Sequence, residues 1–207
     1  MPWVLDAETG RDQFEIAGRW HPEHDLSRAF VDFHRLPEGV EAPVHVLLTS
    51  APERLPEYTA LLNRQIFAGL KARDLLEKFL ANEVQFTDAI VTMPDGSVYG
   101  ESVFLVTFGD GVYVDDGIVV EESDVTPSSI THVQAPDGRS IPLPPRLDVT
   151  KYPPRLMWHR SAVGDRHIWI DKRLRNRVVA SDDLYQAMKD AGITGFQAQE
   201  SLFKRTH

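Results

Sequence analysis

The sequence contains no cysteine, and this absence excludes several kinds of chemistry at once. Disulfide bonds, thiolate metal sites and a cysteine nucleophile all require a sulfur atom that the chain does not have. Proteins of reducing compartments commonly lack disulfides, so the absence favours a cytoplasmic location.

Long apolar runs are absent as well. The first residues, MPWVLDAETG, do not combine a basic region with an apolar segment, so they do not form the pattern of a signal peptide. The apolar run at Val44–Leu48 is far shorter than the about 20 residues that a membrane-spanning helix needs. We therefore expect a soluble cytoplasmic protein without a membrane partner.

Positive charge is scarce. Lys and Arg number 22 against 31 for Asp and Glu, which gives a formal net charge of -9. Nucleic-acid-binding proteins gain much of their affinity from cations placed on phosphates, so this balance argues against a nucleic-acid partner. It suits a soluble protein, or one whose partner protein is basic.

Sequence motifs for catalysis are also missing. The chain has no GxSxG nucleophile elbow, no GxxxxGK[ST] phosphate loop and no GxGxxG loop. Serine and histidine residues occur, but their spacing does not form a recognisable catalytic triad. We therefore predict no catalytic residue and no cofactor.

Two histidines in the stretch HPEHD, His21 and His24, raise the question of a metal site. Zinc sites need three or four ligands on a rigid frame, whereas this stretch contains proline and has no second ligand cluster to join it. The sequence therefore predicts surface histidines here and no bound metal.

A chain of 207 residues is long enough for one large domain or two small ones. Residues 1–60 are rich in proline and irregular in pattern, and Val44–Thr49 is their clearest strand. We expect this segment to form either a separate lobe or a wrap around the main sheet. Residues 61–207 are expected to form an α+β domain.

Helical spacing of apolar residues is clearest in LKARDLLEKFLAN, where Leu76, Phe79 and Leu80 recur on one face before a stop at Asn82. The pattern then changes to a period of two over residues 84–114, which predicts short strands. The turn sequences PDG at residues 94–96 and GDG at residues 109–111 tolerate positive φ and predict hairpins. A second PDG at residues 136–138 separates two more short strands.

The C-terminal stretch VVASDDLYQAMKDAGITGFQAQ, Val178–Gln199, has the pattern strand, helix, strand. Ser181 is a natural helix N-cap, followed by Asp182 and Asp183 in the first turn, and Gly192 is a natural stop. Leu184 and Met188 form a buried stripe between these ends. Together the patterns predict an α+β fold, with a mostly antiparallel sheet and two principal helices.

The stretch RHIWID, Arg166–Asp171, alternates apolar and polar residues and predicts a half-buried strand with Trp169 packed across the sheet. The alternative is a ligand pocket near Trp169, with His159, His167 and Asp171 as its polar groups. In that case the protein would be a small hydrolase or transferase.

The stretch DDGIVVEESD, residues 115–124, holds five acidic residues. Paired carboxylates serve acid–base catalysis or bind calcium, but the apolar IVV interrupts the alternating oxygens that a calcium loop needs. The remaining alternatives are a solvated charged face and a docking face for a basic partner. The candidate partner-binding residues are Asp110, Asp115, Asp116, Glu121, Glu122 and Asp124.

Three stretches in order carry a family resemblance: IFAGLKARDLLEKFLANEVQFTDAIV, VFLVTFGDGVYVDD and VVASDDLYQAMKDAGITGFQAQ. Their order and separation resemble immunity protein family eleven of bacterial polymorphic toxin systems, over roughly residues 64–199. The sequence departs from the family pattern at VYVDDGIVVEESD, where the family tends to place an aspartate and a serine after an aromatic-rich strand. No functional residue is therefore carried over from the family.

The resemblance implies an immunity protein that binds and neutralises a cognate toxin without catalysis. The acidic balance of the chain would speed its encounter with a basic toxin. A structural or assembly module of a secretion system, bound through the proline-rich N-terminal third, is a further alternative.

Overall fold

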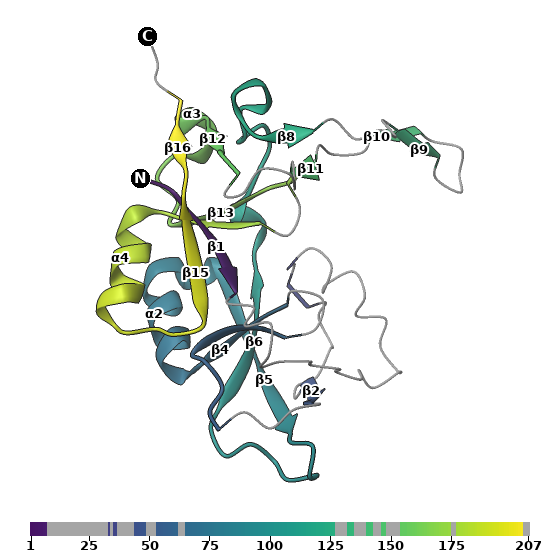
Figure 1. Cartoon of the computed structure of the whole chain (residues 1–207), viewed down its shortest axis with the longest axis vertical. Coiled ribbons are helices and arrows are strands. Elements are labelled where there is room, and N and C mark those ends of the chain that lie inside the picture. Colours follow the sequence, from purple (N-terminus) through teal and green to yellow (C-terminus); the bar gives the residue numbers. More distant parts are fainter. Residues whose placement is uncertain are drawn as a thin grey trace.

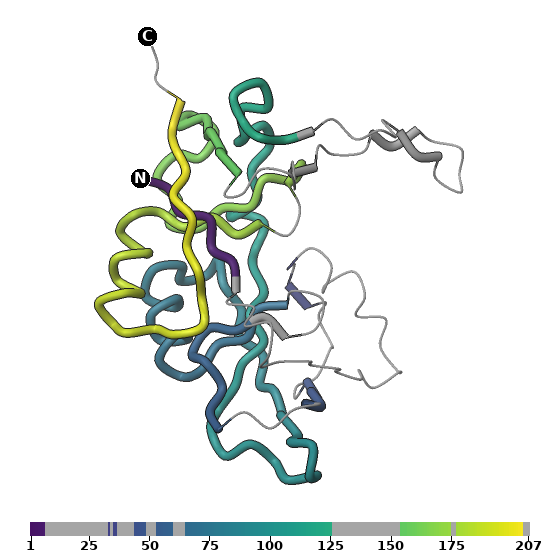
Figure 2. The backbone as a smooth tube through the Cα atoms, in the orientation of Figure 1, coloured from purple at the N-terminus to yellow at the C-terminus, as the bar shows by residue number. Residues whose placement is uncertain are grey.

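The computed structural model describes most of the chain, and the remaining residues are drawn in grey in Figure 2. The described residues are 1–7, 33, 35–36, 44–48, 53–61, 65–126, 132–134, 140–142, 146–147, 154–174 and 177–204. They form two five-stranded sheets, and most strand pairs are antiparallel (Figure 1). With two principal helices beside these sheets, the α+β class is confirmed.

The first sheet has the strand order β15-β1-β14-β13-β7. Its strands are β1 (Trp3–Ala7), β7 (Tyr113–Val114), β13 (Ile168–Asp171), β14 (Val178–Ala180) and β15 (Phe196–Glu200). The N-terminal strand β1 lies between two C-terminal strands and is antiparallel to both, whereas β13 and β7 pair in parallel. The two ends of the chain are therefore joined in one sheet (Figure 1).

The second sheet has the strand order β2-β5-β6-β4-β3. Its strands are β2 (Val44–Leu47), β3 (Tyr58–Leu61), β4 (Gln65–Gly69), β5 (Val84–Thr92) and β6 (Val103–Phe108). Only β2 and β5 pair in parallel within this sheet, as far as the described strands show. Strands from before residue 62 therefore contribute to both sheets.

Shorter elements complete the description. Three two-stranded pairs are β8 (Val125–Thr126) with β11 (Arg146–Leu147), β9 (His132–Gln134) with β10 (Ser140–Pro142), and β12 (Met157–Trp158) with β16 (Leu202–Phe203). The 3₁₀ turns are η1 (Ala81–Glu83), η2 (Asp110–Val112) and η3 (Val120–Glu122), and α3 is a single turn at Arg160–Val163. No helix within the described ranges has the length and apolar content to cross a membrane.

The first principal helix, α2 (Leu70–Leu80), follows the predicted pattern closely. It buries Ala72, Leu76 and Leu80 against the second sheet, as the helical spacing of apolar residues requires. The helix ends where Ala81 takes a φ of 45°, so it stops slightly before the expected end at Asn82.

The second principal helix, α4 (Asp182–Asp190), has both of its predicted caps. The Oγ atom of Ser181 accepts a hydrogen bond from the amide of Leu184 at 3.3 Å. At the other end Gly192 takes a φ of 63°, and its amide and the next one donate to carbonyls of the last turn. This is a Schellman motif, which satisfies the carbonyls that a helix end leaves free. The helix packs on α2 and buries Leu184 and Met188.

The first sheet is covered on both faces, which corrects the expectation for RHIWID. All four residues of β13 are buried, rather than half of them. Ile168 and Ile170 enter the core shared by both sheets and both principal helices, while Trp169 enters a second core with Trp158 and Val179. Because successive side chains of a strand point to opposite faces, a strand covered on both sides buries every residue.

The PDG turn at residues 94–96 is confirmed as a hairpin turn. Gly96 takes a φ of 85°, and its amide donates to the carbonyl of Met93 at 2.9 Å. The second PDG, at residues 136–138, lies outside the described residues, although the flanking strands β9 and β10 pair antiparallel as expected.

The predicted hairpin at GDG, residues 109–111, is wrong. Gly109 takes a φ of -75°, the segment forms η2, and the chain passes from β6 into β7 of the other sheet. Glycine at residue 111 instead allows the carboxylate of Glu83 to approach the backbone, because a Cβ atom on Gly111 would lie 2.5 Å from that carboxylate. That carboxylate accepts the amide of Gly111 at 3.1 Å, so glycine here makes room for a cap.

Candidate functional site

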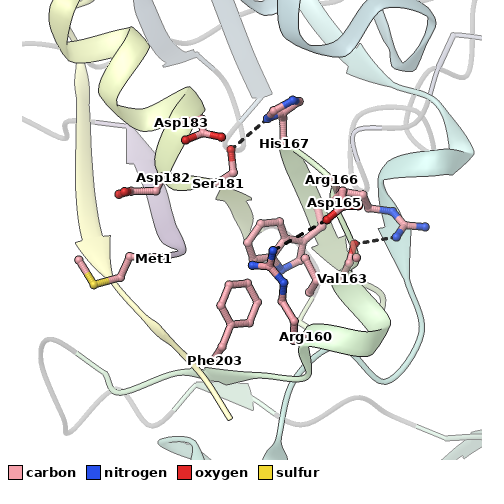
Figure 3. A pocket seen from close by; sticks show the side chains of 12 residues that line it. Met1, Arg160, Val163, Asp165, Arg166, His167, Ser181, Asp182, Asp183 and Phe203 are labelled. Atoms are coloured by element: carbon pink, nitrogen blue, oxygen red, sulfur yellow. Dashed lines mark hydrogen bonds and ion pairs between the residues drawn. The ribbon is translucent and has the colours of Figure 1, made fainter. Parts of the chain in front are cut away.

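A pocket of about 450 Å³ lies beside β13, where α3, the first turn of α4 and β16 meet (Figure 3). One sequence-based alternative placed a pocket near Trp169, and both Trp169 and His167 line this one. The other two polar groups expected there, His159 and Asp171, do not line it. Most of the polar groups that line the pocket were therefore not among those predicted from the sequence.

The floor of the pocket is aromatic. The ring of Trp169 meets Trp158 edge to face at 5.8 Å and stacks on Phe203 at 6.2 Å, between ring centroids. The guanidinium carbon of Arg160 lies 4.8 Å from the centroid of Phe203, which is a cation–π contact. The buried Nε1–H group of Trp169 has no acceptor among the described residues.

His167 and Ser181 form the one serine–histidine contact of this pocket that the described residues show (Figure 3). Their Nδ1 and Oγ atoms are 3.2 Å apart, and the imidazole meets the ring of Phe79 edge to face at 5.0 Å. The same Oγ atom accepts the amide of Leu184, and the amide of Ser181 donates to the carbonyl of His167 at 2.8 Å. The pair therefore fastens the start of α4 to β13, with its hydroxyl used as a helix cap.

Two arginines border the pocket on the α3 side and differ in how firmly their side chains are held by hydrogen bonds and ion pairs. Arg166 is occupied: its Nε donates to Gly111 O at 2.7 Å, and its Nη1 donates to Val163 O at 2.8 Å. Arg160 is looser, because its Nη2 lies 3.9 Å from Asp165 and its side chain is 61% exposed. Only Arg160 of the two is positioned to exchange its contacts for a ligand.

Carboxylates border the pocket on the α4 side and at the turn after α3 (Figure 3). Asp182 accepts a hydrogen bond from Trp3 Nε1 at 2.7 Å, whereas no ion pair of Asp183 is found among the described residues. The side chain of Asp165 is fully exposed. From their position in the sequence, Asp182 and Asp183 indicated only a favourable effect on the helix dipole, and nothing local indicated that they border a pocket.

Asp171 has a structural role instead of the predicted place in the pocket. Its side chain is fully buried, and its carboxylate accepts the amide of Ile118 at 2.7 Å and the amide of Arg173 at 2.8 Å. The guanidinium of Arg173 pairs with the same carboxylate at 3.1 Å. This network ties the end of β13 to the segment after β7. Partial burial of Arg173 lowers its pKa, but the hydrogen bond to Asp171 and the charge of that carboxylate outweigh this effect, so the pKa of Arg173 is raised.

The acidic segment at residues 115–124 is interleaved with cations. Lys172 Nζ lies 2.9 Å from Asp115, and Arg173 Nη1 lies 2.9 Å from Asp116. Both carboxylates are exposed, so these ion pairs contribute little to stability. They do reduce the negative charge that the segment presents to a partner.

The later carboxylates of the segment are paired too. Lys204 Nζ lies 2.7 Å from Glu122, and this hydrogen bond lowers the pKa of Glu122 below its usual value. Asp124 accepts the amide of Arg155 at 2.9 Å. His159, a candidate polar group of the alternative pocket, is instead the residue before α3 and does not line the pocket.

Asp110 stands apart from the rest of the predicted partner-binding group. It lies in η2 and is exposed, next to Gly111, whose carbonyl is bonded by Arg166 at the pocket wall. The remaining residue, Glu121, is exposed in η3 within the acidic segment. Five of the six carboxylates therefore lie on the segment 115–124, and Asp110 lies in η2, outside the pocket lining.

The HPEHD stretch lies outside the described residues. Within the part of the chain that the structure describes, no group of three or more His, Asp or Glu side chains could hold a metal ion.

Comparison with known protein families gives a match over most of the chain. Residues 10–201 match the model of a family described as Immunity protein family (Imm11). This range contains the stretch that carried the resemblance, residues 64–199, and extends to the N-terminal residues that the resemblance had left out. No curated protein matches the chain. Because the match covers nearly the whole sequence, the chain belongs to the Imm11 family of immunity proteins, which points to a toxin-neutralising role.

Proposed function

We propose that the protein binds a cognate toxin in the cytoplasm and neutralises it by occupying its surface, without catalysis of its own. The observation that carries this proposal is the family match over residues 10–201. Neutralisation by occupation requires a stable folded surface and no reacting group. A typical stable interface buries about 1,600 Å² in total, an area within reach of a chain of this size.

We further propose that the acidic group contributes to the docking surface for a basic toxin. The members of this group are Asp110, Asp115, Asp116, Glu121, Glu122 and Asp124. The net charge of -9 and the exposure of most of these carboxylates support the proposal. Since several of them already pair with cations, we expect their main effect on the rate of association rather than on the dissociation rate.

Charge reversal tests this docking surface. Asp115→Lys combined with Glu121→Lys should slow association with the cognate toxin at low salt by about tenfold, because electrostatic attraction steers encounter. The matched control is Asp74→Lys with Glu77→Lys, which reverses two exposed carboxylates on the outer side of α2. Surface plasmon resonance measures both rates, and equal association rates for the two double variants would remove the acidic group from the interface.

The neutralising role itself is tested by co-expression with the toxin encoded next to this protein. We expect growth of a sensitive bacterium to be restored, and a one-to-one complex to be recovered on a tagged chain. Toxicity without rescue, combined with no complex, would refute the proposal.

A small hydrolase or transferase is the competing hypothesis, and the pocket beside His167 is the observation that favours it. His167→Ala distinguishes the two. We expect the variant to bind the toxin and to rescue growth as the wild type does. A folded variant that still binds the toxin but no longer rescues growth would support catalysis.

A further inference from the structure

The pocket beside Trp169 has the carboxylates of Asp182 and Asp183 on its α4 side and the cations of Arg160 and Arg166 on its α3 side, and Met1 lines it as well. Asp165, Asp182 and Asp183 border it, and the first of these is fully exposed with a single cation contact at 3.9 Å. Of the two arginines, Arg166 spends its Nε and Nη1 donors on backbone carbonyls. The pocket therefore offers carboxylates to an incoming group, with Arg160 as the available cation.

The aromatic floor is suited to a positively charged side chain. The rings of Trp169 and Phe203 stack, and the guanidinium of Arg160 already rests on Phe203 at 4.8 Å. This contact shows that the floor accommodates a guanidinium, which the negative face of an aromatic ring attracts. Arg160 is 61% exposed and held weakly, so an incoming cation can replace it on the ring.

A residue that lines the pocket also carries an unpaired donor. Trp169 is 1% exposed, and its Nε1–H has no acceptor among the described residues. A buried donor without an acceptor is unfavourable, so such groups normally meet water or a ligand. The indole groups of Trp3 and Trp158 do have acceptors, at 2.7 and 2.9 Å.

On the basis of the proposed function, we propose that this pocket receives a lysine or arginine side chain of the cognate toxin. Asp182 and Asp183 bind its charged end, and Phe203 and Trp169 form the floor on which its stem lies. A volume of about 450 Å³ is of the size that holds small ligands, and so has room for such a side chain. A basic side chain enclosed in this way acts as an anchor of the interface, so its removal should mainly raise the dissociation rate of the complex.

The experiment uses the full chain and a catalytically inactive form of the cognate toxin. Asp183→Asn removes one charge from the pocket, and we expect the dissociation constant to rise about tenfold, mostly through faster dissociation. Asp190→Asn is the control, since it makes the same change at the exposed far end of α4. We expect it to bind within twofold of the wild type, and thermal unfolding confirms that both variants are folded.

A second variant tests the sign of the occupant's charge. Arg160→Ala uncovers the floor and should leave the affinity unchanged or improve it, because Arg160 competes with the incoming cation. Wild-type affinity in Asp183→Asn would overturn the pocket proposal while leaving toxin binding intact. Weaker binding of Arg160→Ala would overturn it too, in favour of an anionic occupant. Absence of binding by the wild-type chain would overturn both this inference and the proposed function.

Discussion

The buried carboxylate of Asp171 offers the sharpest test of how the first sheet is held together. It is fully buried and accepts amides of Ile118 and Arg173 at 2.7 and 2.8 Å, as well as the guanidinium of Arg173 at 3.1 Å. Replacement by alanine removes the acceptor of the Ile118 and Arg173 amides at the end of β13, whereas the guanidinium keeps Asp116 and the carbonyl of Ile118 as acceptors. The perturbation is therefore Asp171→Ala, with Asp171→Asn as the milder change.

The magnitude follows from the burial of each partner. Leaving a buried amide such as that of Ile118 unsatisfied costs about 1–3 kcal/mol. Breaking a fully buried ion pair costs about 3–5 kcal/mol, but Arg173 is 29% exposed and also pairs with Asp116, which lowers that figure. We expect Asp171→Ala to lower the free energy of unfolding by about 3 kcal/mol in total. Asp171→Asn keeps one acceptor oxygen and should cost about 1–2 kcal/mol.

Urea denaturation followed by circular dichroism measures these changes. A loss of about 3 kcal/mol in a chain of this length corresponds to a fall in Tm of about 6–12 °C. The control is Asp115→Ala, which removes an exposed carboxylate paired with Lys172 and should cost less than about 1 kcal/mol. If Asp171→Ala were no less stable than this control, the structural role assigned to the buried carboxylate would be wrong.

Two further predictions concern glycine and pH. Gly195 has a φ of 90°, and a Cβ atom there would lie 2.1 Å from a backbone carbonyl oxygen, so Gly195→Ala should lower the free energy of unfolding by more than about 1 kcal/mol. The control is Gly100→Ala, which has open space around it and should change the free energy of unfolding by less than about 0.5 kcal/mol. Equal melting temperatures for the two variants would contradict this prediction. Hydrogen bonds from the Ser97 hydroxyl and amide lower the pKa of Asp95. This carboxylate therefore stabilises the fold above its unfolded pKa, and the contribution is lost as pH falls through the folded pKa. Ser97→Ala should raise that pKa in an NMR titration, and an unchanged pKa would refute the assignment.

Features set by a few neighbouring residues could be predicted from the sequence. The cap at Ser181, the stop at Gly192 and the PDG turn at residues 94–96 each satisfy backbone groups within one or two turns of chain. The apolar stripes of α2 and α4 were visible for the same reason, since helical spacing is local. These elements were enough to predict the α+β class.

Features that depend on distant segments could not be predicted in this way. The strand β1 pairs with β14 and β15 at the other end of the chain, and no local pattern specifies those partners. Burial of β13 on both faces follows from a second core that Trp158 and other distant residues supply. The glycines of residues 109–111 have the sequence of a turn, but in the fold they make room for the carboxylate of Glu83. That carboxylate comes from η1, so the local sequence does not show why glycine is needed.

The same limit applies to the candidate site. The acidic segment was evident from composition, but its neutralising cations are Lys172, Arg173 and Lys204, which come from other segments. Asp171 closes an apolar strand and was one candidate polar group of the alternative pocket, although folding buries it against Arg173. The pocket itself joins α3, α4 and β16, so Asp165 joins Asp182 and Asp183 at one pocket only in the folded chain.

The central claim is that this chain neutralises a toxin by binding it, and the most direct measurement is growth rescue combined with co-purification. The protein encoded next to this chain is expressed in a sensitive bacterium, with and without the tagged chain. We predict toxicity alone, restored growth on co-expression, and a one-to-one complex that survives purification. A toxic neighbour that the chain neither binds nor neutralises would contradict the claim.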